Sequence, residues 1–160
     1  MSAQTLETRA LKYELEVPID APADAVWSAL TEETNAWWLP DFHMVGADSV
    51  VTLDCRAGGA LVESLPDGGS LLWYTVHMVN PGKSLHLVGH LGSEFGGPAT
   101  TLLALTLEDQ GGRTLLKVTD ALVGHVNEEN ADCLAEGWRQ LFTEGLAAHA
   151  AGAAAGKADG

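Results

Sequence analysis

The sequence predicts an α+β fold, in which a seven-stranded curved antiparallel sheet wraps round a long C-terminal helix and two short helices follow the first strand. Three observations predict it. An alternating strand segment opens the chain, six further strand segments follow one another across short turns, and the last segment has apolar residues at helical spacing. A long amphipathic helix has to bury its apolar side against another element, and the sheet is the only partner large enough.

The first quarter of the chain predicts one strand and two short helices. Residues 11–17 alternate apolar and polar side chains, which is the period of a half-buried strand. Pro22 suits the first turn of a helix whose apolar residues recur every three to four positions. A second short helix carries the pair Trp37 and Trp38. It stops at Pro40, because proline disfavours helical backbone in the residue before it.

The rest of the chain predicts six strands and the long helix. Turn-forming Gly, Pro, Asn and Asp residues separate the strands, which favours an antiparallel meander. The strand segments are 49–56, 60–64, 71–79, 84–91, 100–108 and 114–122. The helix is expected over 129–150, and the small-residue segment 151–160 is expected to be a disordered tail. Residues 1–150 are therefore interpreted as a single domain.

The formal net charge is −14, from 8 basic and 22 acidic residues. A field of this sign repels phosphate backbones and anionic membrane surfaces, so we expect no nucleic-acid partner and no membrane insertion. No apolar run approaches the roughly 20 residues that span a bilayer, and no apolar signal core opens the chain. These features favour a cytoplasmic protein.

The sequence offers no pattern for a metal or a cofactor. Cys55 and Cys133 lie far apart and are expected to be free thiols. The 6 histidines are scattered, whereas structural zinc needs four closely held ligands. No Gly-rich segment has the phosphate-loop pattern. We therefore expect neither a metal nor a cofactor.

Alternation along the two strands before and after the Asn-Pro-Gly turn predicts which side chains face the helix. If Val79 lies opposite Leu85, then His77 and Trp73 share the inner face with Leu87. The outer face of the earlier strand then carries only apolar side chains, namely Leu72, Tyr74, Val76 and Met78. An apolar face of this kind favours a homodimer.

Two polar side chains are expected on the inner face. Asp120 follows Val118 at the same alternation, and a carboxylate in apolar surroundings has its pKa raised by desolvation. Asp120 could bind a cationic or hydroxylated ligand or act as an acid or base, or it could lie near water at the strand end. His77 could orient a ligand or transfer a proton, or it could be a structural histidine.

A ligand pocket is expected between these faces and the long helix. One tryptophan of the pair at 37 and 38, with Phe42 and Met44, could form an apolar gate, or these side chains could simply pack. The predicted ligand-binding residues are Trp38, Phe42, Trp73, His77, Leu87, Leu103, Leu105, Val118, Asp120, Trp138 and Leu141.

Several short motifs occur in the order in which a known superfamily carries them. They are Ala21-Pro22 with Val26-Trp27, Trp37-Trp38, Arg56-Ala57-Gly58-Gly59, Asn80-Pro81-Gly82 and Gly137-Trp138. Residues 10–150 thereby resemble the SRPBCC (START-like, helix-grip) superfamily and, within it, the homologues of the activator of a heat-shock chaperone ATPase.

The resemblance implies a helix-grip fold and a cavity for lipids, sterols, polyketides or other apolar molecules; some members of the superfamily are cyclases. Two residues depart from the family pattern. Asp120 stands where the family often has a histidine. Gly89, expected opposite Thr75, stands where a tryptophan is common, and this loss of bulk is expected to enlarge the cavity.

The function favoured by these features is binding of a small apolar or amphipathic molecule between the sheet and the C-terminal helix. One alternative is an enzyme of the cyclase, dehydratase or hydrolase type that uses Asp120 or His77. A second alternative, implied by the resemblance alone, is a chaperone-associated regulatory protein of the stress response.

Overall fold

Seven antiparallel strands form one curved sheet in the computed structural model, which describes residues 1–158. The strands are β1 (Arg9–Ile19), β2 (Val50–Leu53), β3 (Ala60–Ser64), β4 (Ser70–Asn80), β5 (Ser84–Leu91), β6 (Ala99–Asp109) and β7 (Thr114–Gly124). Their order is β1-β7-β6-β5-β4-β3-β2, so strands β2 to β7 follow one another as a meander and β1 pairs with β7. This topology confirms the predicted sheet.

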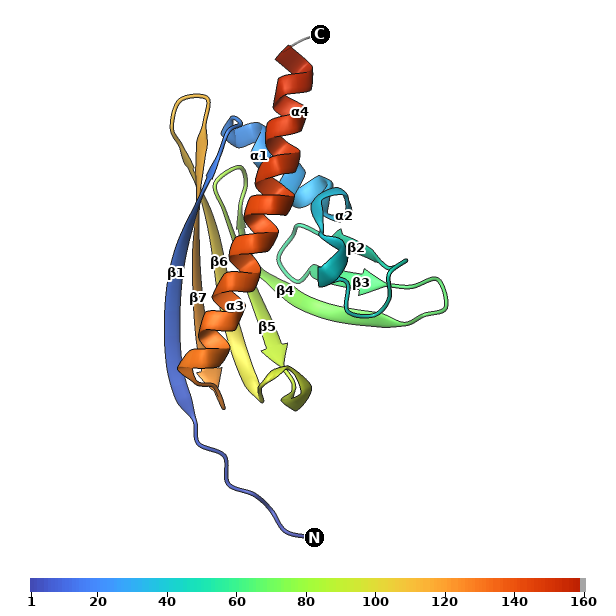
Figure 1. Ribbon diagram of the computed structural model, residues 1–160, viewed down its shortest axis with the longest axis vertical. Helices are drawn as coiled ribbons and strands as arrows, with labels where there is room; N and C mark the ends of the chain where they lie inside the picture. Colours follow the sequence, from blue (N-terminus) through green and yellow to red (C-terminus); the bar gives the residue numbers. More distant parts are fainter. Residues whose placement is uncertain (159–160) are drawn as a thin grey trace.

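A long C-terminal helix crosses the concave side of the sheet, and two short helices lie at one end (Figure 1). The helical segments are α1 (Ala23–Glu32), α2 (Thr34–Trp37), the 3-10 turns η1 (Pro40–Phe42) and η2 (Ser93–Phe95), and the consecutive α3 (Glu128–Gln140), η3 (Leu141–Ala147) and α4 (Ala148–Ala158). The predicted α+β fold class is confirmed.

The C-terminal segment differs from its prediction. Residues 151–158 continue the helix as α4, whereas a disordered tail was expected over 151–160. The segment is rich in alanine, which has the highest helix propensity and extends a helix that is already formed. Residues 159–160 lie outside the described residues.

The helix and the inner face of the sheet bury a continuous apolar core. Fully or almost fully buried side chains come from β1, β5, β6 and β7 and from the helix; they include Val17, Leu85, Leu103, Leu116, Val118, Trp138, Leu141, Phe142 and Leu146. Each large aliphatic side chain removed from water contributes roughly 1.5–3 kcal/mol. The burial of Trp138 against the sheet confirms its expected position.

Strand β4 contains an irregularity that changes its inner face. Val79 lies opposite Leu85 as predicted, but the register shifts between Val76 and Met78, and Val76 lies opposite Leu87. His77 is the extra residue of this bulge and is exposed, so its predicted inward position is wrong.

The same shift removes the apolar outer face that favoured a homodimer. Tyr74 and Val76 are buried on the inner side, with 5% and 2% of their surface exposed. Leu72 and Met78 are the two side chains of the predicted set that remain exposed. The expectation of a homodimer therefore loses its basis in β4.

The long helix approaches α2 at a glycine. Gly145 lies in η3, a π-helical segment, and a Cβ atom placed on it would lie 2.3 Å from the backbone oxygen of Trp37. The Trp37 indole nitrogen in turn donates to the backbone oxygen of Ala29 at 2.8 Å. The absence of a side chain at Gly145 therefore allows the helix, α1 and α2 to pack together.

Replacing Gly145 with alanine is expected to lower the free energy of unfolding by about 1–3 kcal/mol, because the helix has to move away from Trp37. The matched control is Gly152→Ala in α4, where a Cβ meets no atom within 4 Å. The control is expected to gain up to about 1 kcal/mol from helix propensity. Urea unfolding of both variants checks this, and equal gains in both would contradict the packing argument.

Candidate functional site

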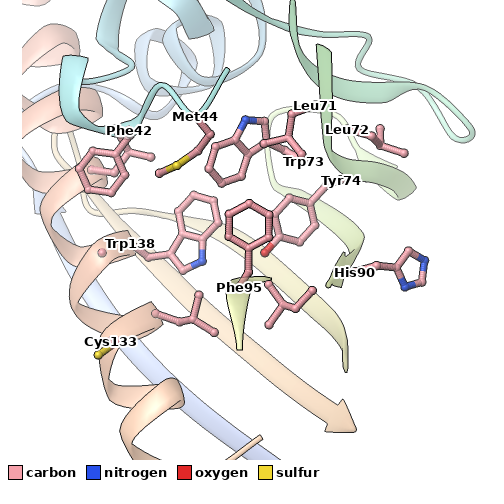
Figure 2. A pocket seen from close by; sticks show the side chains of 14 residues that line it. Phe42, Met44, Leu71, Leu72, Trp73, Tyr74, His90, Phe95, Cys133 and Trp138 are labelled. Carbon is pink, nitrogen blue, oxygen red and sulfur yellow. The ribbon is translucent and has the colours of Figure 1, made fainter. Parts of the chain in front are cut away.

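A largely apolar pocket of about 240 Å³ lies between the long helix, β4, β5 and the segment after η1. Figure 2 shows Trp138 of α3 facing Tyr74 of β4, with Phe42 and Met44 along one side. The ring of His90, which also borders the pocket, is turned away from this group. The lining therefore consists mainly of aromatic and aliphatic side chains.

The mouth of the pocket is formed by apolar side chains that are half exposed. Met44, Leu72 and Phe95 have 49%, 53% and 48% of their surface exposed, and all three border the pocket. They come from three separate segments, namely the residues after η1, β4 and η2. Exposed apolar groups that gather round a hollow are typical of a binding site.

A second irregularity in β4 brings two consecutive aromatic rings to this site. The register between β3 and β4 shifts, so that Leu61 lies opposite Tyr74 while Val62 lies opposite Leu72. Trp73 is the extra residue. Its ring lies 5.2 Å from that of Trp38, and the Tyr74 ring lies 5.9 Å from that of Trp138. Neighbouring residues of a regular strand point to opposite faces, so the bulge is what aims both rings inward.

The space beside Gly89 of β5 is filled by this arrangement, so Gly89 does not enlarge the cavity. A Cβ atom on Gly89 would lie 2.8 Å from Cε1 of Tyr74 and 2.9 Å from the backbone oxygen of Trp73. Thr75, the expected partner of Gly89, pairs with Val88 instead. The expectation that Gly89 widens the cavity is therefore wrong, because the Tyr74 ring occupies that space.

A buried polar cluster lies behind Tyr74. Asp120 has no exposed surface, which confirms its predicted inward position. Its carboxylate accepts a hydrogen bond from the Tyr13 hydroxyl at 2.7 Å and another from the Thr101 hydroxyl at 2.5 Å. The Tyr74 hydroxyl lies 3.4 Å from the Thr101 hydroxyl. Burial raises the pKa of the Asp120 carboxyl, and the two hydrogen bonds oppose this shift.

The pocket brings together four of the predicted ligand-binding residues, which are Phe42, Trp73, Trp138 and Leu141. Met44 of the predicted gate also lines it. Contact of these residues with a ligand remains a prediction.

The other seven predicted residues lie outside this pocket. Four line a separate void of about 20 Å³ on the core side; they are Trp38, Leu87, Leu103 and Leu105. Val118 is core, and Asp120 lies in the polar cluster behind Tyr74. His77 is exposed at the bulge.

Sequence reasoning placed Tyr74 on the wrong face and did not select Leu134 or Phe95 for the site. Leu134 precedes Trp138 by four residues on α3, a spacing that puts both on one side of the helix, so a signal for it was present. Phe95 lies in a glycine-rich turn, where no periodicity shows the direction of a side chain.

A second buried carboxylate, Glu63 of β3, holds the segment that carries Met44. Its carboxylate accepts hydrogen bonds from the backbone N–H groups of Met44 and Val45 at 2.7 and 3.0 Å, from the Ser49 hydroxyl at 2.7 Å, and from the Trp73 indole at 3.0 Å. Burial by itself would raise the pKa of Glu63, but these hydrogen bonds outweigh it and hold the pKa below the usual value.

Glu63 was also missed, although the sequence carried a signal for it. It follows Leu61 by two residues in a strand, and alternation places both on the inner face. A carboxylate on an inner face requires donors, and here loop and side-chain groups supply them.

The described residues hold no cluster of three or more histidine, cysteine, aspartate or glutamate side chains that could bind a metal. Cys55 and Cys133 are free thiols, and Cys133 lies at the pocket. No helix within residues 1–158 is long and apolar enough to cross a membrane.

The sequence profile of one protein family, described as Activator of Hsp90 ATPase homolog 1-like protein, matches residues 20–151. The chain belongs to this family. The match extends from the end of β1 into α4 and includes the whole pocket. Comparison with curated protein sequences finds no match.

Solved structures similar to this member of the Hsp90 ATPase activator homolog 1-like family support the fold. The Mll3558 protein from Rhizobium loti is 21% identical and has a TM-score of 0.65; the matched region covers 85% of this chain and 94% of the Mll3558 chain. CalU16 from Micromonospora echinospora is 21% identical, with 87% and 82% covered and a TM-score of 0.57.

A third similar structure is DynU16, a protein in the dynemicin biosynthetic locus. It is 23% identical and has a TM-score of 0.57; the matched region covers 85% of this chain and 49% of the DynU16 chain. At these identities the three structures establish the shared fold.

The two buried carboxylates are expected to give opposite dependences of stability on pH. The pKa of Asp120 is raised in the folded state, so above about pH 4 the unfolded chain loses a proton that the folded chain keeps, and stability falls as pH rises. Asp120→Asn removes this effect. The variant is therefore expected to gain stability relative to the unmodified protein as pH rises, by about 1.4 kcal/mol for each unit of pKa difference. Parallel curves in urea unfolding from about pH 4 to pH 8 would contradict this.

The pKa of Glu63 is lowered, so its contribution is present above the unfolded pKa and is lost as pH falls through the folded pKa. Glu63→Gln is expected to cost about 2–4 kcal/mol at neutral pH, because charge-assisted hydrogen bonds are lost, and less in acid. The control is Glu14→Gln on β1, an exposed carboxylate that pairs with Lys12. Thermal unfolding of the variant, the control and the unmodified protein at neutral and at acid pH checks this. A loss of stability in Glu63→Gln that is larger in acid than at neutral pH would be inconsistent with the Glu63 assignment.

Proposed function

We propose that this protein binds a small, largely apolar molecule of one or two fused rings in the pocket between α3 and β4. The observation that supports this most is the aromatic-lined cavity with a half-exposed apolar mouth. Trp73, Tyr74 and Trp138 present ring faces and edges to the space, and such rings favour stacked and edge-on contacts with a flat ligand.

The size of the pocket supports a ligand of this kind. Its volume is about 240 Å³. An apolar cavity of about 150 Å³ is enough to take up benzene. Burial of roughly 250 Å² of ligand surface would contribute about 6 kcal/mol before the entropic costs of binding, so affinities in the micromolar to millimolar range are expected.

Titration with indene, a fused-ring hydrocarbon, tests the proposal by amide and indole NMR. The protein has 5 tryptophans, and the indole signals of Trp73 and Trp138 are expected to shift most. Saturable shifts confined to residues far from the pocket, or no saturable shift, would contradict the proposal.

A filled pocket is expected to bind indene less tightly. Leu134 is half-buried on α3 and borders the pocket, so Leu134→Phe is expected to weaken indene binding at least tenfold, about 1.4 kcal/mol, by occupying the space. The matched control is Leu102→Phe on β6, a half-exposed position that does not line the pocket, where the affinity is expected to change less than about twofold. Equal losses in both variants would refute the location of the site.

A further inference from the structure

The hydrogen bonds around Asp120 have a fixed direction. Once the Asp120 carboxyl has lost its proton, it only accepts hydrogen bonds, and the hydroxyl protons of Tyr13 and Thr101 both point to it. Within residues 1–158, no ion pair involves Asp120, so hydrogen bonds from these two hydroxyl groups are what stabilise its negative charge. Thr101 has a single hydroxyl proton, and that proton is used.

The direction of the next hydrogen bond, between Tyr74 and Thr101, is therefore fixed as well. The Tyr74 hydroxyl lies 3.4 Å from the Thr101 oxygen. Since the Thr101 proton is directed at Asp120, the Thr101 oxygen can only accept, and Tyr74 has to donate. Burial and the charge of Asp120 raise the pKa of Tyr74, against smaller opposing effects of Thr101 and Trp138, so its hydroxyl keeps the proton that it donates.

The oxygen of Tyr74 is left to face the pocket as a hydrogen-bond acceptor. Tyr74 lines the pocket, and its hydroxyl points into the group of lining side chains in Figure 2. The other polar groups at the pocket do not compete for this role: the His90 ring is turned away, and Cys133 is a weak donor near the mouth. The Trp73 indole donates to Glu63, and the Trp138 indole N–H is directed at Tyr74 itself, where it opposes the rise in the Tyr74 pKa. The ligand therefore meets an acceptor where a tyrosine would otherwise offer a donor.

We infer that the pocket selects neutral ring compounds that carry an N–H or O–H donor, and that Tyr74 determines this selectivity because Thr101 and Asp120 hold its proton. This inference rests on the proposed binding function and specifies its ligand class. Compounds of the same shape that offer only an acceptor gain nothing at Tyr74, because their lone pair would face the Tyr74 oxygen.

Three bicyclic compounds that differ at one ring position provide the test: indole has an N–H donor, benzofuran has an oxygen acceptor, and indene has neither. At pH 8, calorimetric titration is expected to show indole binding about three- to tenfold more tightly than indene, the effect of one neutral hydrogen bond. Benzofuran is expected to bind within about twofold of indene.

Two variants separate Tyr74 from a general effect of polarity. Tyr74→Phe is expected to bring the ratio of indole to indene affinity close to one. Thr101→Val frees the Tyr74 proton and is expected to give benzofuran an advantage over indene. The control is Tyr13→Phe, which removes the other hydroxyl at Asp120 but does not line the pocket, and the preference for indole is expected to persist.

The outcomes distinguish this inference from the proposed function. Binding of all three compounds with equal affinity, or a preference for indole that survives Tyr74→Phe, would overturn the inference and leave the pocket as an apolar site. Failure of all three to bind would overturn the proposed function itself.

Discussion

The two register shifts in β4 determine which side chains meet the long helix. In an unbroken strand, alternation would send Trp73 and Tyr74 to opposite faces; the extra residue in each bulge changes the phase, so Trp73, Tyr74 and Val76 all serve the inner side. The pocket, the space beside Gly89 and the contact with Thr101 depend on this change of phase. The affected stretch is short, yet it provides the β4 side chains that line the pocket.

Two carboxylates with no exposed surface flank this stretch and are stabilised in different ways. Glu63 has four donors, two of them backbone groups of the loop that carries Met44, so it fixes one side of the pocket as an anion. Asp120 has two hydroxyl donors, and desolvation prevails over them. The first acts as a structural tether, while the second imposes a direction on the hydroxyl groups beside it.

Much of the architecture was predictable because strand alternation, turn residues and helical spacing act locally. Asp120 and Trp138 were placed correctly on that basis, since β7 and α3 are regular along their length. His77 and Tyr74 were misplaced because β4 carries apolar residues on both sides of each bulge, so hydrophobicity does not reveal where the phase changes. Phe95 could not be placed from the sequence, because its position depends on a turn that has no period.

The aromatic column inside the molecule has a mechanical consequence for the pocket. Trp138 stacks on Phe142 with 5.2 Å between ring centroids and an interplanar angle of 14°, and Phe142 lies 6.2 Å from Trp37, which is anchored to α1. Trp138 therefore cannot retreat without displacing a series of rings in a close-packed interior. The side chains of Met44 and Phe95 at the opposite rim are half exposed and belong to no such series of packed rings, although Glu63 holds the Met44 backbone. The pocket thus has one rigid wall, at Trp138, and one deformable edge, at the side chains of Met44 and Phe95. It therefore limits the thickness of a bound ligand strictly and the length of the ligand less strictly.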